Sequence, residues 1–428
     1  MIGGMNMYRK TTEELLEFLE KSPTPFHAVR LMEDLLRANG YEACPEDSRW
    51  TLQKGGRYYV TRNGSALIAF AIPENDIDGY RILASHSDSP TFKIKENPEI
   101  TVDDRYVKLN VERYGGMLCA PWFDRPLSVA GRVIVKEKDS FVSRLVDVDR
   151  DLVMIPNLAI HMNREANDGY KYNAQKDLLP LYGDITAKDT FLKTIAEAVG
   201  VKPEDILGHD LFLYNRQKGS IWGAHEEFVS CGRLDDLQCA FASLKGFLAG
   251  AKTQSLAVHC VLDNEEVGSG TKQGAASTFL RDTLSRISAA LGFTEEERLI
   301  QLARSFMISA DNAHAVHPNY TDKADPTNRP YLNGGIVMKF NANQKYCTDG
   351  ISAAMFRALC QEAEVPVQTF TNRSDMAGGS TLGNISNTQV ALHTVDIGLP
   401  QLAMHSPYET AGVKDTQYLI QAAEKFFR

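Results

Sequence analysis

The chain has 428 residues, of which 43% are hydrophobic and 24% are charged, as in ordinary globular proteins. A net charge of −9 without a long Lys/Arg block argues against nucleic acid and membrane surfaces as partners, and no stretch has the ~18–20 apolar residues of a membrane span. The seven cysteines lack CxxC spacing, and the N-terminus lacks the apolar core of a signal peptide. We therefore expect a cytoplasmic protein with free thiols, built as two domains or as one domain with an insertion.

The first ninety residues combine amphipathic helices with short apolar runs. Thr11 and Glu14 fit a capping box for a helix through EELLEFLEKS, the following SPTPF ends that helix, and a second helix is expected at about 27–38. The runs at 65–72 and 80–88 are bounded by turn residues and are typical of buried strands. This part of the chain is expected to begin an α/β sheet.

A segment of different character follows, from about Thr91 to Glu227. Alternating stretches such as ITVDDRYVKLNV and SVAGRVIVKE are separated by charged or glycine-containing turns, which favours antiparallel strands. One helix is expected at 188–200. We predict that residues 92–232 form an inserted β-rich domain.

Strands and helices alternate again from Arg233 onward. The expected strands are 256–262, 305–311, GGIVMKF and VALHTVDIG; the expected helices are LQCAFASLKGFLAG, about 273–287, 350–364, a short one after GGSTLG, and a last one up to Phe427. This alternation predicts a sheet with helices on both faces. We predict one α/β domain made of residues 1–91 and 233–428.

Potential metal ligands recur where predicted strands end or helices begin, at the edge where α/β sheets carry their sites. They are His86, Asp88, Asp235, Glu265, Glu266, Asp311 and His405. Each alone is ordinary for a turn or a helix cap, and His259 inside an apolar run is expected to be a core residue. Together, so many carboxylates at one edge would repel one another unless cations held them.

The residue types indicate which cation and how it is held. Histidine with carboxylates suits Zn²⁺, with Mn²⁺ or Co²⁺ as substitutes, and a two-metal centre needs a bridging carboxylate, for which Asp235 is suited. Asp88 lies two residues from His86 and is expected to orient its ring. Because neighbours on an extended chain point in opposite directions, Glu265 and Glu266 are expected to do different work.

In this order, these motifs resemble those of the dinuclear metallo-aminopeptidases, and most closely the aspartyl aminopeptidase family. The matching stretches are ASHSDSPTFKIK, SCGRLDDLQCAFASL, DNEEVGSGTKQGA, SADNAHAVHPNY, NGGIVMKFNANQKY, SDMAGGSTLG and DIGLPQLAMHSPYE. The resemblance implies a metallopeptidase-type sheet flanked by helices, whose inserted β-rich domain serves as a lid and in oligomerisation. It also implies assembly into a homododecamer.

The resemblance also implies roles for particular residues. Two Zn²⁺ ions per subunit are expected, one on His86 and Asp311 and the other on Glu266 and His405, with Asp235 as the bridge. The remaining implied roles are catalytic base for Glu265, a contact with a neighbouring subunit's site for His161, and substrate binding for Lys339 and Tyr346.

The expected function is hydrolysis of the N-terminal residue of peptides, with preference for aspartate or glutamate. Ala377 and Gly378 in MAGGSTLG, and the stretch HSPYE that starts at His405, depart from the sequence pattern of the family near the pocket, which leaves strict acidic selectivity open. The alternatives are a broader leucyl or glutamyl aminopeptidase, a deacylase or carboxypeptidase on the same scaffold, and a non-catalytic oligomeric scaffold protein.

Overall fold

The computed structural model describes residues 2–250 and 255–428, and its contacts divide the chain into two compact units. The first unit consists of Met1–Asp88, Gly219–Met404 and Glu409–Arg428. The second consists of Ser89–Lys218 and His405–Tyr408. Within the described ranges, no helix has both the length and the apolar character needed to cross a bilayer.

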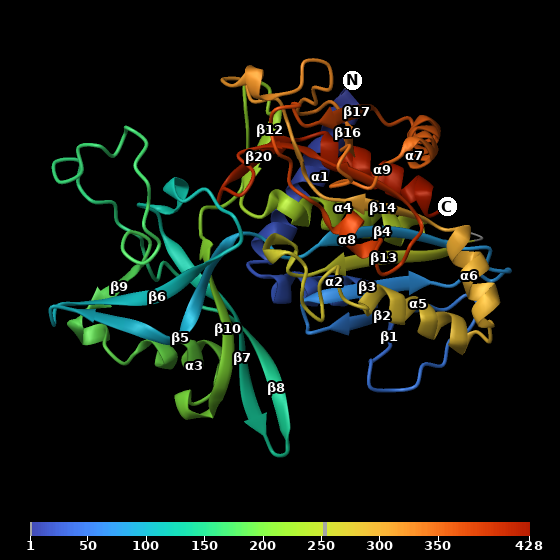
Figure 1. Cartoon of the computed structure of the whole chain (residues 1–428). Coiled ribbons are helices and arrows are strands. Elements are labelled where there is room, and N and C mark those ends of the chain that lie inside the picture. The colour runs from blue at the N-terminus through green and yellow to red at the C-terminus, as the bar shows by residue number, and fades with distance from the viewer. Residues whose placement is uncertain (1, 251–254) are drawn as a thin grey trace. The chain divides into compact units, whose positions relative to one another are not determined.

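The first unit is built on a large, mostly parallel sheet (Figure 1). In spatial order its strands are β1 (Glu42–Ala43), β2 (Arg57–Arg62), β3 (Ala66–Ala71), β13 (Leu256–Leu262), β4 (Tyr80–His86), β14 (Phe306–Ala310), β18 (His393–Gly398), β16 (Ile336–Phe340) and β17 (Val367–Thr371). The central strands β13, β4, β14 and β18 are parallel to their neighbours in that series, so their carboxyl ends lie at one edge. Every residue of β13 and β14 is buried.

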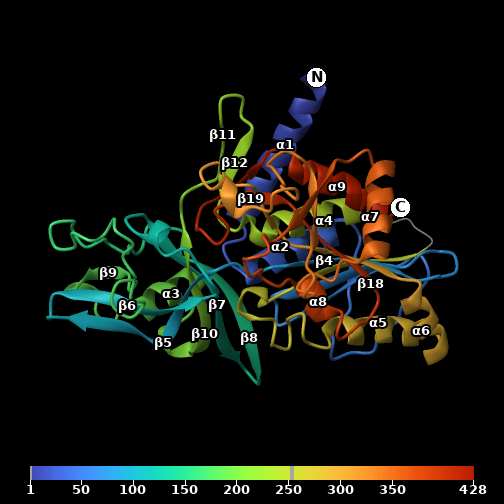
Figure 2. The same ribbon diagram turned by 45° about the horizontal axis from the view of Figure 1, so that its top comes forward.

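Helices cover both faces of this sheet, as the alternation in the sequence predicts (Figure 2). One face packs against α1 (Ile2–Glu20), α2 (Pro25–Ala38), α4 (Leu234–Gly250), α7 (Gly350–Glu362) and α9 (Asp415–Phe426). The other packs against α5 (Phe279–Ala290), α6 (Glu295–Ala303) and α8 (Leu382–Ser386). The two hydrophobic clusters are therefore separated by the sheet, and the predicted α/β class is confirmed.

Two helix predictions are wrong in their starting points. Thr11 lies inside α1, which begins at Ile2, so it does not cap the helix; its hydroxyl donates to Oε1 of Gln417 at 2.6 Å instead. The helix expected at about 273–287 begins later, at Phe279, because polar turns occupy 271–278.

A smaller sheet completes the first unit. Its strands are β11 (Ser220–Trp222), β12 (Phe228–Cys231), β20 (Glu409–Gly412), β19 (Pro400–Leu402) and β15 (Ala313–His314). The strand β20 carries Glu409, which is buried, next to Cys231 on β12. This sheet therefore brings the C-terminal part of the chain next to the segment that leads into α4.

The second unit is an antiparallel sheet with its own core. Its strands, in spatial order, are β8 (Ser140–Asp147), β7 (Leu127–Glu137), β10 (Ile206–Asn215), β5 (Thr91–Val102), β6 (Tyr106–Tyr114) and β9 (Leu181–Asp184). The helix α3 (Phe191–Val199) packs on this sheet through Phe191 and Ile195, which belong to the unit's core. The β-rich character and the helix expected at 188–200 are thus present.

Candidate active site

The edge formed by the carboxyl ends of the central strands collects the predicted ligands of the first unit. His86 is the last residue of β4 and pairs in register with Leu262 at the end of β13. Asp311 directly follows β14, which is parallel to β4. Since these strands run the same way, residues about 225 positions apart in the chain meet at one edge.

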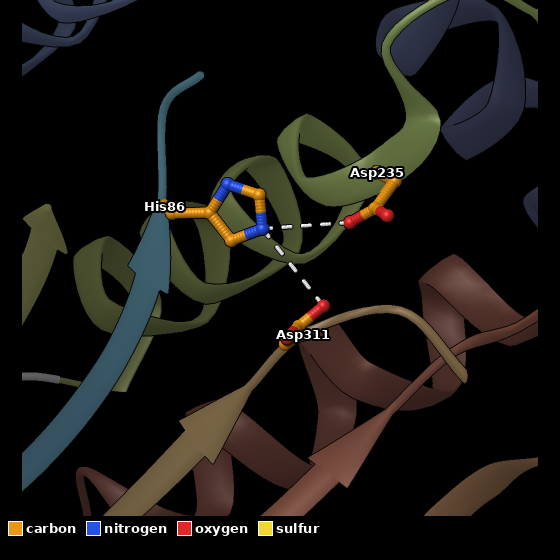
Figure 3. Close-up of side chains that lie close together, drawn as sticks. All are labelled: His86, Asp235 and Asp311. Carbon is orange, nitrogen blue, oxygen red and sulfur yellow. Dashed lines mark ion pairs between the residues drawn. The ribbon is translucent and has the colours of Figure 1, made fainter. Parts of the chain in front are cut away.

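The ring of His86 lies at the centre of this group and is 1% exposed. Its Nε2 lies 3.4 Å from Oδ1 of Asp235 and 3.8 Å from Oδ1 of Asp311, with both carboxylates directed at the ring edge (Figure 3). Burial opposes protonation, but the hydrogen bonds with Asp235 and Asp311 outweigh it and hold the pKa of His86 well above its ordinary value. Two donors about 2.1 Å from one tetrahedral ion lie about 3.4 Å apart, so this spacing fits two ligands of one Zn²⁺ ion.

Asp235 and Asp236 are both buried at the start of α4, where their backbone angles are not yet helical. The N–H group of Asp235 donates to Oε2 of Glu409 at 3.0 Å. Oδ2 of Asp236 accepts a hydrogen bond from the N–H group of His86 at 3.1 Å. The proposed bridging carboxylate is thus fixed from the backbone side, and its neighbour fixes the end of β4.

Glu265 and Glu266 lie in a 3₁₀ turn (Glu265–Val267), so the expectation that they lie on an extended chain is wrong. The turn is entered through Asn264 in the left-handed region (φ 59°) and left through Gly268 (φ 93°). The carboxylate of Asp88 accepts from both glutamate N–H groups, at 3.1 Å and 3.2 Å. One shared acceptor therefore holds the main chain of both glutamates.

Asp88 also orients the first histidine. It is 1% exposed, and its Oδ1 lies 3.3 Å from Nδ1 of His86. A buried acceptor on one ring nitrogen fixes which nitrogen is left to bind a metal. This arrangement is the one that the two-residue spacing in the sequence predicts.

The carboxyl groups at this edge are electrostatically strained without a cation. Burial and neighbouring carboxylates, first Asp311, raise the pKa of Glu265 to about 8 against the opposing effect of His86. Burial and the Asp235 carboxylate raise the pKa of Glu266 well above its ordinary range. A divalent cation would relieve this repulsion and return the carboxyl groups to their charged forms.

The donor set fits zinc in its chemistry and spacing. Ligand atoms of His86, Asp235 and Asp311 lie within 4.8 Å of one another, and so do those of His86, Glu265 and Glu266. Imidazole with carboxylates is a borderline donor set, which Zn²⁺ prefers and which Mn²⁺ or Co²⁺ also accepts.

Lys339 lies beside this group, in β16, and is buried with 3% exposed. Its Nζ donates to the main-chain oxygen of Asn312 at 2.8 Å and lies 3.9 Å from Oδ2 of Asp311. Tyr346, also buried, has its ring centre 5.5 Å from this ammonium group. Burial disfavours the charged form of Lys339, but the nearby carboxylate of Asp311 outweighs it and raises its pKa. Lys339 is thus a buried cation and not a surface residue.

Two predicted site residues belong to the second unit. His405 lies in the segment 405–408, where its main-chain oxygen accepts from the N–H group of Leu118 at 3.2 Å. His161 is exposed in a turn whose neighbours Ile160 and Met162 are also exposed. The ligand role of the first and the intersubunit role of the second stay predictions.

Two residues of the site carried no recognised signal in the sequence. In the sequence, Asp236 is only the neighbour of Asp235 at a predicted helix start, and Glu409 is only the last residue of HSPYE. Their backbone-directed hydrogen bonds depend on tertiary packing, which no short motif records.

Comparison with known proteins agrees with this geometry. The family model described as "Aminopeptidase I zinc metalloprotease (M18)" matches residues 18–427. A protein of Clostridium novyi (strain NT), "Probable M18 family aminopeptidase 2", is 47% identical over 426 residues, which cover 98% of each chain.

Solved structures match over nearly the whole chain. A chain in the cryo-EM structure of the Ape4 and Nbr1 complex has a TM-score of 0.95 and 35% identity, covering 98% of this chain and 86% of its own. The mApe1 dodecamer of S. cerevisiae has a TM-score of 0.87 and 28% identity, covering 99% of this chain and 97% of its own. The resemblance seen in the motifs is confirmed: the chain belongs to the M18 family of zinc metalloproteases and is an aminopeptidase.

Proposed function

We propose that this aminopeptidase removes acidic N-terminal residues from peptides through a dinuclear zinc centre in which Glu265 is the general base. The observation that carries the specificity is Lys339, a buried cation whose Nζ lies 3.9 Å from the proposed ligand Asp311. A cation held out of water beside the reacting centre favours an anionic substrate side chain over a neutral one.

The proposed ligand sets follow from the family resemblance and are supported by the distances around His86. One ion would be held by His86 and Asp311, the other by Glu266 and His405, with Asp235 between them. Two Zn²⁺ ions are proposed per subunit, with Mn²⁺ or Co²⁺ as substitutes. When bound, such a pair polarises the scissile carbonyl group and lowers the pKa of a bound water.

The chain's own residues would then move the proton and orient the site. With the cations bound, the pKa of Glu265 would fall and its carboxylate would be ionised. It would then take the proton from the attacking water and return it to the leaving amine. The Asp88 carboxylate holds the backbone of Glu265 and the ring of His86, so the base and a ligand keep fixed positions. Glu409 holds the backbone of Asp235.

Lys339 and Tyr346 are proposed to form the pocket for the substrate's N-terminal side chain. The aromatic ring covers the ammonium group on one side, at 5.5 Å, and restricts where a carboxylate can approach. The Lys339 ammonium group already lies close to the Asp311 carboxylate. A substrate carboxylate that binds Lys339 therefore competes with Asp311, and this competition lowers the affinity for the substrate. Selectivity therefore depends on how far Asp311 is neutralised by the metal.

Self-association is proposed on two grounds. The related mApe1 structure is a dodecamer, and the loop around His161 exposes Leu158, Ile160 and Met162, at 58%, 46% and 76%. Apolar side chains in such a cluster favour burial against another chain. We propose that residues 92–232 act as a lid and in oligomerisation, that His161 contacts a neighbouring subunit's site, and that twelve copies assemble.

A cytoplasmic location is proposed from the cysteines. All seven are free in the structure, and five of them are buried, as expected of thiols kept reduced.

The proposed specificity is tested on purified protein with a panel of chromogenic aminoacyl substrates and an N-acetylated aspartyl substrate. We expect the highest kcat/KM for Asp and Glu, loss of activity with a chelator, and two zinc ions per subunit by elemental analysis. Equal rates for Leu and Asp would favour the broader aminopeptidase. Cleavage of the N-acetylated substrate alone would favour a deacylase, and an inactive zinc-loaded protein would favour a scaffold.

A further inference from the structure

Asp396 is a fully buried carboxyl residue on β18. Its Oδ2 accepts a hydrogen bond from the N–H group of Cys347 at 2.6 Å and lies 2.9 Å from that residue's Sγ. Its Oδ1 accepts from the hydroxyl group of Thr381 at 2.9 Å. One side chain thus joins two loops that are more than thirty residues apart in the sequence.

The first loop is the one that carries Tyr346. The main chain of Asp396 also binds this loop, because its N–H group donates to Oγ1 of Thr348 at 2.8 Å. Residues 347 and 348 are therefore held by both the backbone and the carboxylate of one strand residue. Because Tyr346 directly precedes them, the position of its ring relative to Lys339 depends on this attachment.

The second loop is the glycine-rich segment 378–383, whose last two residues begin α8. Thr381 immediately precedes that helix, and Gly383 lies in its first turn. A Cβ atom on Gly383 would come within 2.4 Å of Oδ1 of Asp396 and 2.7 Å of Oγ of Ser309. The turn is thus packed directly on the carboxylate, with no room for a larger residue at that position.

The strand that carries Lys339 lies next to Asp396 as well. β16 is antiparallel to β18, with Met338 opposite Ile397, so the next position places Lys339 opposite Asp396. Three elements around the proposed substrate pocket therefore meet at this residue: the strand with Lys339, the loop with Tyr346 and the turn before α8.

We propose that Asp396 is a positioning residue for substrate binding, whose carboxylate fixes the loop with Tyr346 and the turn 378–383 in place beside Lys339. Burial excludes water as a substitute partner, so the groups that donate to this carboxyl group would be left without a hydrogen bond if it were removed. The inference rests on the proposed function, in which Lys339 and Tyr346 bind the substrate's N-terminal side chain.

Hydrogen exchange followed by mass spectrometry tests the link without any substrate. In the zinc-loaded Asp396→Ala protein we expect faster exchange in peptides covering 344–349 and 378–386 together. Thr381→Val removes one of the contacts, so faster exchange is expected in 378–386 alone. Unchanged exchange at both segments in Asp396→Ala would overturn the proposal.

Kinetics separate positioning from a general loss of stability. Asp396→Ala is expected to raise KM by about 10- to 100-fold, the loss that follows removal of buried hydrogen bonds, with kcat and zinc content little changed. Asp396→Asn keeps an oxygen for the Cys347 N–H group, so its KM is expected to lie close to that of the wild type. The control Thr294→Ala removes a helix cap on α6 and is expected to lower the melting temperature without raising KM.

The outcomes distinguish this inference from the proposed function. A wild-type enzyme with no preference for acidic residues would refute the proposed specificity. The role of Asp396 would still be decided by hydrogen exchange in Asp396→Ala and by the KM of that variant for the substrate that the wild type cleaves best. A fall in kcat with unchanged KM in Asp396→Ala would overturn the positioning role. If that variant does not fold, Thr381→Val carries the test: unchanged exchange in 378–386 would then overturn the proposal.

Discussion

Asp88 accepts a hydrogen bond from the main-chain N–H group of Glu265 at 3.1 Å, while its Oδ1 also lies 3.3 Å from Nδ1 of His86. The proposed base and a proposed ligand thus share one buried carboxylate. We expect Asp88→Asn to weaken zinc binding by about 10- to 100-fold, as is usual when such an outer partner is lost. Competition with a chromophoric chelator measures this. Asp76→Asn, at an exposed carboxylate paired with Lys54, is the control and should bind zinc normally.

Replacing Glu265 separates base catalysis from metal binding. Glu265→Gln keeps the size of the side chain but cannot take a proton, so kcat should fall by about 10²–10⁴-fold with zinc retained. Glu266→Gln, its neighbour in the same turn, should instead lose zinc. Elemental analysis beside steady-state kinetics checks both. Near-normal turnover in Glu265→Gln would remove it from the mechanism.

Replacing Lys339 tests the origin of the acidic preference. Lys339→Met keeps the apolar stem and removes the charge, so the ratio of kcat/KM for Asp over Leu substrates should fall by about 10-fold or more. Most of the change should appear in the Asp substrate. Lys345→Met, on the exposed side of the same segment, should leave the ratio unaltered. An unchanged ratio in Lys339→Met would place the specificity elsewhere.

The pattern of the sequence predicted the sheet well where burial alone decides the structure. The run at 256–262 is a strand with those same bounds because Ser255 and Asp263 end the apolar stretch abruptly. The start of α5 was missed because Oδ1 of Asn264 accepts from Thr271 and from Gln273 and holds that stretch in turns. Hydrogen bonds of this kind leave no periodicity in the sequence.

Some residues of the candidate site could be predicted from the sequence in the same way, and others could not. Residues such as His86 and Asp311 end apolar runs, so strand ends identified them. Glu409 and Asp396 act through backbone groups distant in the sequence, and nothing local distinguishes them from ordinary acids. The conformation of Glu265 and Glu266 was also beyond reach, because the 3₁₀ turn depends on the acceptor Asp88.

His259 should make the free energy of unfolding depend on pH, independently of the active site. It is fully buried, stacked 5.8 Å from the ring of Phe247, and burial lowers its pKa from 6.5 to about 3. Its stabilising contribution is therefore present above pH 6.5 and is lost as the pH falls toward 3, since the unfolded state takes up the proton first. His259→Gln removes this titration. The difference in unfolding free energy between wild type and variant should shrink by about 2 kcal/mol from pH 7.5 to pH 5.0.

Denaturant unfolding at the two pH values, compared between the two proteins, measures that change. Because both proteins share every other titratable group, the difference isolates residue 259. A difference that stays constant with pH would mean that the pKa of His259 is not lowered in the fold.

Removing the metal should destabilise the protein more at alkaline pH. In the metal-free state Glu265 has a pKa raised to about 8, so its proton is retained by the fold and stability falls as the pH rises from about 4.5 to 8. Bound cations remove that repulsion. The gap in melting temperature between zinc-loaded and chelated protein should widen from pH 6 to pH 8.5. A constant gap would argue against buried carboxylates as the origin of the effect.

The insertion of the second unit between β4 and α4 has a consequence for how the protein is made. His86 leaves the ribosome long before Asp311, and at 5–20 residues per second the interval is roughly 10–45 s. During this time residues 89–218 emerge and can fold on their own core. The proposed zinc site, by contrast, has no complete set of donors until β14 has joined the sheet and His405 has been made. With an incomplete zinc site, a chain still being synthesised would not hydrolyse the N-termini of other chains nearby.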